Sequence, residues 1–238
     1  MKTEGLGFDK EEFAALQTAS DREIGERGFH LLFSGTLLWG FLLNFILVAV
    51  LQRPLYRLLY RSGENAGSIL IALLVGYIVL CVVGSRMLRS QSTVTNFIGF
   101  NLIAVPVGVL LAVTLASYVG QMDLVYNALL LTMAATAVMM TLSMLFPAFF
   151  RGIGHTLGLG LLGALIASGL AALFFPRLFT VIDYCVAGLM CLYIGFDWGR
   201  VMECPRTPRN AIAVAASLYL DILNLFLRLL AILRKNKD

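Results

Sequence analysis

Long runs without charged residues alternate with short polar segments along the 238-residue chain. Asp, Glu, Lys and Arg are absent from residues 31–51, 66–85, 90–122, 124–150 and 156–175. Two further runs, 177–199 and 211–233, contain only three and two charged residues. Each run reaches the roughly 20 apolar residues that a helix needs to cross a bilayer. The runs are continuously apolar and do not alternate, which favours helices over barrel strands.

This pattern predicts an all-α membrane protein with seven transmembrane helices, because backbone polar groups in lipid must be satisfied within each segment. The expected spans are about 31–51, 66–86, 94–116, 124–147, 156–176, 178–200 and 209–233. Composition agrees, since 59% of the residues are hydrophobic, 13% are charged, and the mean hydropathy is +0.86. A soluble helical protein is excluded, because seven nearly chargeless runs cannot each be covered by polar surface in a chain of this length.

The N-terminal residues 1–29 form a polar arm, and residues 30–238 form the predicted transmembrane domain. The arm contains both acids and bases before the first span, so that span is not expected to be a cleaved signal. Phe13, Leu16 and Ala19 fall on one side of a helix, which favours an amphipathic helix on the membrane surface. A frayed, solvated tail is the alternative.

Turn residues and basic residues separate the predicted spans. Residues 52–65 contain Pro54, Gly63 and three arginines, and they are predicted to form an interfacial turn of helix. Before the last span, Thr207 can cap a helix that opens at Pro208.

Lysine and arginine are more frequent in the segments that lie inside if the N-terminus is cytoplasmic. We therefore expect a multi-pass plasma-membrane protein with a cytoplasmic N-terminus. The basic C-terminus opposes a simple seven-pass crossing, and its side of the membrane stays open.

Cysteine, histidine and glycine add little chemistry. The four cysteines form no CxxC motif, so neither a zinc site nor a disulfide framework is indicated. His30 and His155 fall at span borders, which favours interfacial positions over catalytic ones. The small residues within 158–169 predict a close approach between neighbouring helices.

Acidic side chains inside the spans are the main candidates for function. A charge at the centre of a bilayer costs at least about 2.5–3.5 kcal/mol, and such groups usually mark a pathway or relay. Asp183 lies early in its span near Arg177 and is predicted to be interfacial. Asp197 lies late in the same span, and its alternative interpretation is an edge residue paired with Arg200. Asp221 lies near the middle of the last span with no charge within one turn.

The sequence around these acids resembles a known family. LYIGFDWGRVM (192–202), followed by a short proline-containing loop and AVAASLYLDILNLFLRLLAIL (213–233), is similar to the closing two helices of the Bax inhibitor-1 family. The segment Ser217 to Phe226 is the most distinctive part, and Asp197 lies 24 positions before Asp221, as in the family. The chain is identified as a bacterial member.

The resemblance implies a seven-helix bundle whose last helix is central. It also implies that Asp197 and Asp221 form a di-aspartyl unit that senses pH and gates a slow calcium leak. In bacterial members a basic residue at the end of the second helix closes the pore, and here Arg86 or Arg89 takes that role. Contact between the two acids is a family expectation, since a simple hairpin of the last two helices offsets them along the axis.

Elementary chemistry fits this expectation. Adjacent carboxylates do not both ionise readily, so they share a proton and titrate in two coupled steps. Calcium takes 6–8 oxygen ligands. Asp197, Asp221 and the nearby Asn224 supply too few for a tight site, which favours transit over storage. Arg228 is a further candidate for a supporting polar residue.

The expected partners are the lipid bilayer, calcium as the permeant ion, and protons, with no bound cofactor and no nucleic acid. An enzyme is not expected, because GFDWGR and YLDILN do not resemble the sequences around intramembrane aspartyl protease acids, and both histidines lie at span borders. The alternative function is regulation of a membrane-anchored ATP-dependent protease, as is thought for some bacterial relatives, with the N-terminal arm as the contact.

Overall fold

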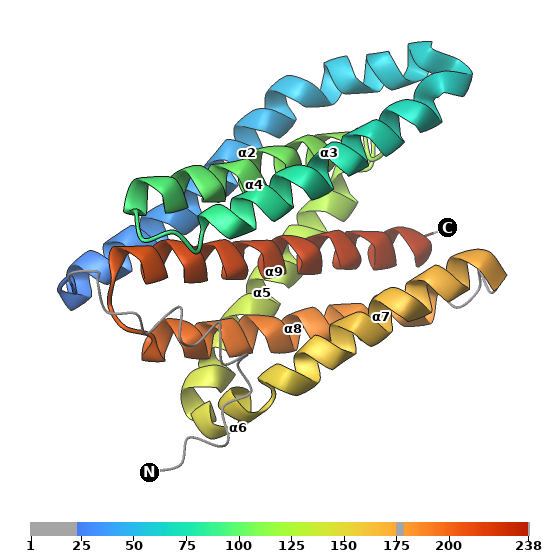
Figure 1. Cartoon of the computed structure of the whole chain (residues 1–238). Coiled ribbons are helices and arrows are strands. Elements are labelled where there is room, and N and C mark those ends of the chain that lie inside the picture. The colour runs from blue at the N-terminus through green and yellow to red at the C-terminus, as the bar shows by residue number, and fades with distance from the viewer. Residues whose placement is uncertain (1–22, 175–178, 238) are drawn as a thin grey trace. The chain divides into compact units, whose positions relative to one another are not determined.

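The computed structural model describes residues 23–174 and 179–237. All regular secondary structure in these residues is helical, as predicted. The elements are α2 (Glu26–Ser62), the 3-10 turn η1 (Gly63–Asn65), α3 (Ala66–Met87), α4 (Thr93–Ala116), α5 (Met122–Leu145), α6 (Pro147–Gly152), α7 (Gly154–Phe174), α8 (Phe179–Glu203) and α9 (Pro208–Lys235) (Figure 1). Most of the predicted N-terminal arm, residues 1–22, lies outside the described residues.

Six of the described helices are long and apolar enough to cross a membrane: α2, α3, α4, α5, α8 and α9. Helix α7 occupies the remaining predicted span, but the side chains of its last turns lie outside the described residues. A multi-pass helical membrane protein is therefore established. The count of seven spans and the central position of the last helix stay predictions.

Helix α2 is longer than the sequence indicated. It continues through Pro54 and ends only at Ser62, where Gly63 has a positive φ of 49°. Proline inside a membrane helix is tolerated because neighbouring groups satisfy the freed carbonyl. The prediction of helix at 52–65 is therefore confirmed for residues 52–62, which continue α2 without a break, and the helix of 37 residues extends over about 55 Å.

The chain divides into two compact units, and α2, α3 and α4 belong to the one that contains residues 18–121 and 205–216. In this unit α2 and α4 run in the same direction. The Trp39 Nε1 donates to the Asn101 Oδ1 at 3.0 Å, and the Gln52 Nε2 donates to the Leu115 carbonyl at 2.9 Å. Two glycines bring α3 against α4, since a Cβ added to Gly84 would lie 2.7 Å from the Gly99 carbonyl oxygen.

The sequence pattern predicted such a glycine contact in α7 instead. There, a Cβ added to Gly160 would lie 3.0 Å from the Leu189 Cδ1, whereas Gly158 and Gly163 have open space around them in the described structure. Small residues allow a close approach between helices, but which small residues are used depends on the neighbouring helix. The expected close approach is therefore confirmed at Gly160, and Gly169 lies outside the described side chains.

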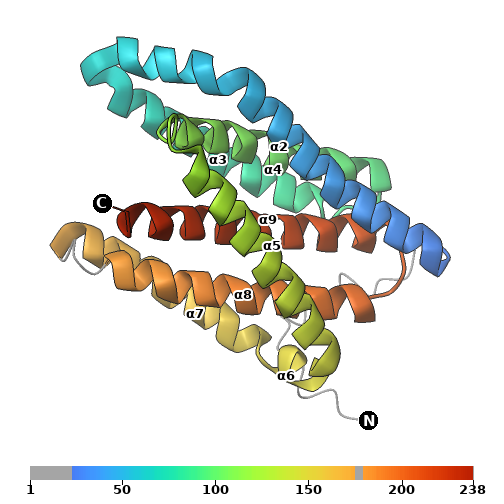
Figure 2. The same cartoon turned by 180° about the vertical axis from the view of Figure 1, so that it is seen from behind.

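The second unit contains residues 122–204 and 217–238, and α5, α6 and α7 surround α8 within it (Figure 2). Helix α6 places the ring of Phe150, which is 3% exposed, against Gly195 of α8. Phe150, Leu157 and Phe196 form a buried apolar cluster. This packing fixes the half of α8 that carries Asp197.

The start of α9 follows the predicted capping pattern. The Thr207 Oγ1 accepts a hydrogen bond from the Asn210 N–H at 3.2 Å, and the helix begins at Pro208. Asn210 also donates from Nδ2 to the Pro205 carbonyl at 2.9 Å. The capping prediction is confirmed, and the short connection fixes where α9 begins after α8.

Candidate functional site

Most polar residues of helix α9, apart from Arg209 and Arg234, lie on a single face. Successive members of this face are seven, four, three, four and seven positions apart, which keeps them within a narrow arc of an α-helix. They are Asn210, Ser217, Asp221, Asn224, Arg228 and Lys235. The opposite side is apolar and buried, with Ile212, Tyr219 and Leu230 at most 1% exposed. Such a face in a membrane helix must lie against other polar groups or water.

Helix α8 has a matching polar face. Asp183, Tyr193, Asp197 and Arg200 are ten, four and three positions apart, so they also share one side of the helix. Both acids are buried, since Asp183 is 5% exposed and Asp197 is 2% exposed. Two acids therefore lie inside the second unit, where a charge needs a partner.

The structure brings Asp197 and Asp221 together between α8 and α9. Their side chains are within hydrogen-bonding reach of each other. Each carboxyl has a buried Oδ2 atom that accepts no hydrogen bond from any donor among the described residues. A carboxylate only accepts hydrogen bonds, whereas a protonated carboxyl also donates one. A proton shared by the pair would therefore supply a donor to one of these oxygens.

Arg200 lies next to this pair. Its Nη1 is 3.3 Å from the Asp197 Oδ1, and its side chain is 14% exposed. Its charge also acts on Asp221. Asp197 was alternatively expected to be an edge residue paired with Arg200. The pairing with Arg200 is present, but Asp197 is buried and does not lie at a solvated edge. With one shared proton, the two acids and the guanidinium together are neutral.

Tyr193 is part of the same site, although its sequence context predicted no role for it. It lies one turn before Asp197 and is close enough to interact electrostatically with both Asp197 and Asp221. The four-residue spacing between Tyr193 and Asp197 was the available signal.

Asp183 is held by two cations from α9. Its Oδ1 accepts from the Arg228 Nη1 at 2.7 Å, and its Oδ2 accepts from the Lys235 Nζ at 2.7 Å. Asp183 was predicted to be interfacial near Arg177, a residue that lies outside the described chain. Arg228 was predicted to support the aspartate pair, and that role stays a prediction, since its described ion-pair partner is Asp183. We call Asp183, Arg228 and Lys235 the charge clamp.

The aspartate pair and the charge clamp follow one antiparallel register. Asp183 precedes Asp197 by 14 residues on α8, and Lys235 follows Asp221 by 14 residues on α9. With a rise of 1.5 Å per residue, the two contacts are separated by about 21 Å along the helices. Polar contacts therefore join α8 and α9 at two levels of the membrane-spanning segment.

The remaining predicted site residues are Asn224, Arg86 and Arg89. Asn224 is exposed, and it forms no described hydrogen bond to either acid. Arg86 lies in the last turn of α3 and Arg89 in the turn that follows, and both are exposed. They belong to the other compact unit, so the pairing of either arginine with Asp197 stays a prediction.

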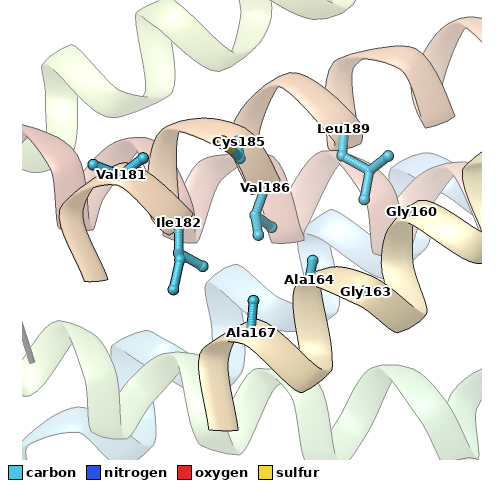
Figure 3. A pocket seen from close by; sticks show the side chains of 9 residues that line it. All are labelled: Gly160, Gly163, Ala164, Ala167, Val181, Ile182, Cys185, Val186 and Leu189. Atoms are coloured by element: carbon cyan, nitrogen blue, oxygen red, sulfur yellow. The ribbon is translucent and has the colours of Figure 1, made fainter. Parts of the chain in front are cut away.

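No group of three or more His, Cys, Asp or Glu side chains that could hold a metal ion occurs in the described residues. A cavity of about 280 Å³ lies between α7 and α8, apart from the two acids (Figure 3). Gly163, Ala164, Ile182, Cys185 and Leu189 are among its lining residues, and the lining is free of charged side chains. Among its lining residues the cavity therefore offers no carboxylate ligand for a cation.

The helices and the buried ionisable groups define a multi-pass helical membrane protein with a polar interface between α8 and α9. The profile of the family described as "Inhibitor of apoptosis-promoting Bax1" matches residues 26–238. The chain is also 31% identical over 237 residues to "Protein LIFEGUARD 4" of Arabidopsis thaliana, covering 90% of this chain and 92% of that protein. The chain therefore belongs to the Bax inhibitor-1 family, and the motif-based prediction of the family is confirmed.

Proposed function

We propose that this protein is a pH-sensitive calcium-leak channel of the plasma membrane, gated by Asp197 and Asp221. The observation that carries the proposal is the meeting of two carboxyl groups between α8 and α9, each with a buried oxygen that accepts no described hydrogen bond. Two adjacent carboxyl groups inside a membrane are energetically costly, and such groups usually mark an ion pathway or a proton relay.

A shared proton joins the two helices. In that state one carboxyl donates to the other, and Arg200 balances the remaining negative charge. When the proton leaves, two negative charges face one positive charge, and like charges at this distance repel each other. The energy of that repulsion biases α8 and α9 to separate near Asp197 and Asp221. Because the separation exposes the polar faces of both helices, it opens a path for a cation.

Calcium is the proposed permeant ion because the deprotonated pair presents carboxylate oxygens, which are its preferred ligands. Two carboxylates fall short of the 6–8 oxygens of a tight site, so the ion passes with much of its water retained. Arg200 competes with calcium for Asp197, which further weakens binding and suits a slow leak.

The test is calcium flux into proteoliposomes between about pH 6 and pH 8, on both sides of neutral pH. Wild-type flux is expected to rise with pH. Asp221→Asn and Asp197→Asn keep the side-chain shape but remove the ionisable pair, so their flux is expected to be independent of pH. Asp123→Asn is the matched control, because Asp123 is an exposed acid in the first turn of α5.

Two outcomes contradict the proposal. If wild type and both variants show equal flux that does not depend on pH, gating by this pair is excluded. Absence of flux at every pH favours the alternative, in which the chain regulates a membrane-anchored protease. In that case deletion of the N-terminal arm is the next measurement, with protease activity in membranes as the readout.

A further inference from the structure

The C-terminal end of α2 continues beyond the helix that packs on it. The Gln52 Nε2 donates to the carbonyl of Leu115, one residue before the end of α4 at Ala116. The ten residues of α2 that follow, 53–62, therefore extend past the end of α4. We call residues 53–62 the α2 extension (Figure 1).

The α2 extension begins where the hydrocarbon region is expected to end. The chargeless run 31–51 contains 21 residues of the same helix. At 1.5 Å per residue it covers about 31 Å, which matches the roughly 30 Å core of a bilayer. The next residues of α2 therefore enter the headgroup layer without a break in the helix.

One face of the α2 extension is basic and aromatic. Arg53, Arg57 and Arg61 follow at four-residue intervals, and all three are exposed. Tyr56 and Tyr60 lie beside them, with stacked rings whose centroids are 6.3 Å apart. Tyr60 is 80% exposed. The segment 53–62 contains no Asp or Glu, and none of its arginines forms an ion pair with a described residue.

The other face of the α2 extension is apolar. Leu55 and Leu59 lie opposite the arginines on the helix, and Leu58 lies at the edge of that face, three residues before Arg61. Leu58 is 49% exposed. A segment with leucines on one side and arginines with tyrosines on the other matches the boundary between acyl chains and headgroups. Arginine is suited to that layer because its planar guanidinium binds phosphate oxygens through two parallel hydrogen bonds.

We propose that the α2 extension binds the headgroups of anionic phospholipids in the leaflet that the C-terminal end of α2 enters. The three arginines, which form no ion pair among the described side chains, match the negative charge of those headgroups, and the leucine face lies toward the acyl chains. A soluble acidic protein or free phosphate satisfies the arginines but leaves the leucines in water. The proposal does not depend on the calcium-leak function.

The test measures lipid binding to the full-length protein by native mass spectrometry in detergent, with dioleoyl phosphatidylglycerol and dioleoyl phosphatidylcholine as probes. The wild type is expected to bind phosphatidylglycerol more tightly. In Arg53→Gln/Arg57→Gln/Arg61→Gln, binding of phosphatidylglycerol is expected to weaken by about fivefold to tenfold, because each arginine near an anionic surface contributes measurably to the attraction. Binding of phosphatidylcholine is expected to stay unchanged.

Two control variants isolate the cause. Arg53→Lys/Arg57→Lys/Arg61→Lys keeps the three charges and is expected to keep most of the preference. Arg151→Gln/Arg206→Gln also removes arginines, but these already pair with Glu203 at 3.1 Å and with Glu26 at 3.5 Å. It is expected to bind phosphatidylglycerol as the wild type does.

Three results overturn the proposal. The first is equal binding of the two lipids by the wild type. The second is a glutamine variant that keeps the wild-type preference for phosphatidylglycerol. The third is full displacement of phosphatidylglycerol by inorganic phosphate, which identifies a site for the free anion. All substituted positions are exposed, so circular dichroism is expected to show unchanged helicity in every variant.

Discussion

Two glycines in the second unit differ in what surrounds their Cα atoms. A Cβ at Gly195 of α8 would lie 2.2 Å from the Phe150 Cε1, whereas a Cβ at Gly163 of α7 has nothing within 4 Å. Phe150 is buried in the apolar cluster beside the aspartate pair. The ring therefore has little room to move, and the site depends on the absence of a side chain at Gly195.

We expect Gly195→Ala to lower the free energy of unfolding by about 1–3 kcal/mol, the usual cost of overpacking. Gly163→Ala is the matched control and is expected to be neutral or slightly stabilising, since alanine favours helices over glycine. Unfolding of both variants in lipid–detergent bicelles measures the difference. Equal stability of the two variants contradicts the packing described for Phe150.

Cys204 lies in the connection between α8 and α9, outside the spans. Burial raises the pKa of its thiol to about 11, although the charge of Arg200 opposes the shift. At neutral pH the thiol is therefore protonated, and only the thiolate reacts. Its labelling by a water-soluble maleimide is expected to be slow near pH 7 and to accelerate about tenfold per pH unit until the pH approaches that pKa.

The measurement uses a protein in which the other three cysteines are serine. Lys237→Cys, combined with Cys204→Ser, provides an exposed thiol near the C-terminus for comparison. Rapid labelling of Cys204 at neutral pH, at the rate of this comparator, is the outcome that contradicts a half-buried thiol with a raised pKa.

At the scale of elements, the charge clamp joins α8 to α9. The Asp183 side chain is 7% exposed, whereas those of Arg228 and Lys235 are 40% and 38% exposed. The acid is therefore the buried member of the charge clamp, and the two cations are partly exposed. Removal of both cations leaves a buried carboxylate without compensation, which typically costs about 3–5 kcal/mol.

We expect Arg228→Gln/Lys235→Gln to be destabilised by an amount toward the lower end of that range, because the two cations are partly exposed. Adding Asp183→Asn to this variant is expected to recover much of the loss, since it removes the uncompensated charge. Unfolding in bicelles gives both values. If the triple variant is no more stable than the double variant, Asp183 does not carry a buried charge that needs these partners.

Local signals in the sequence predicted element boundaries where a single residue decides them. Thr207 and Pro208 set the start of α9, and the structure has that start. Pro54 did not end α2, because a membrane helix tolerates proline, and the helix ends at Ser62, just before Gly63. The partner of Arg228 was not predictable, because it depends on the register between α8 and α9, and neither helix encodes that register alone.

At the scale of the molecule, hydropathy predicted the helical membrane class and the motif predicted the family, because both depend on local sequence. The meeting of Asp197 and Asp221 did not follow from spacing. Asp197 lies six residues before the end of α8, and Asp221 lies 13 residues after the start of α9. A hairpin with aligned ends offsets them by about 10 Å. Their contact depends on how the two helices are staggered, which is a tertiary property.

The two levels of contact between α8 and α9 lead to a prediction about the proposed leak. If the aspartate pair separates while the charge clamp holds, the clamp limits how far the helices move. Loss of the clamp then favours the open state at every pH. The variant Asp183→Asn/Arg228→Gln/Lys235→Gln is suited to this test because it leaves no unpaired buried charge and keeps the aspartate pair.

We expect this variant to raise calcium flux at about pH 6 by roughly fivefold, because two partly exposed ion pairs together contribute up to about 1–2 kcal/mol. The ratio of flux at about pH 8 to flux at about pH 6 is expected to fall toward one. Arg151→Gln is the control, because it removes the exposed ion pair with Glu203 in the same unit. If the triple variant keeps the wild-type ratio of the two fluxes, the charge clamp does not restrain the movement of the aspartate pair.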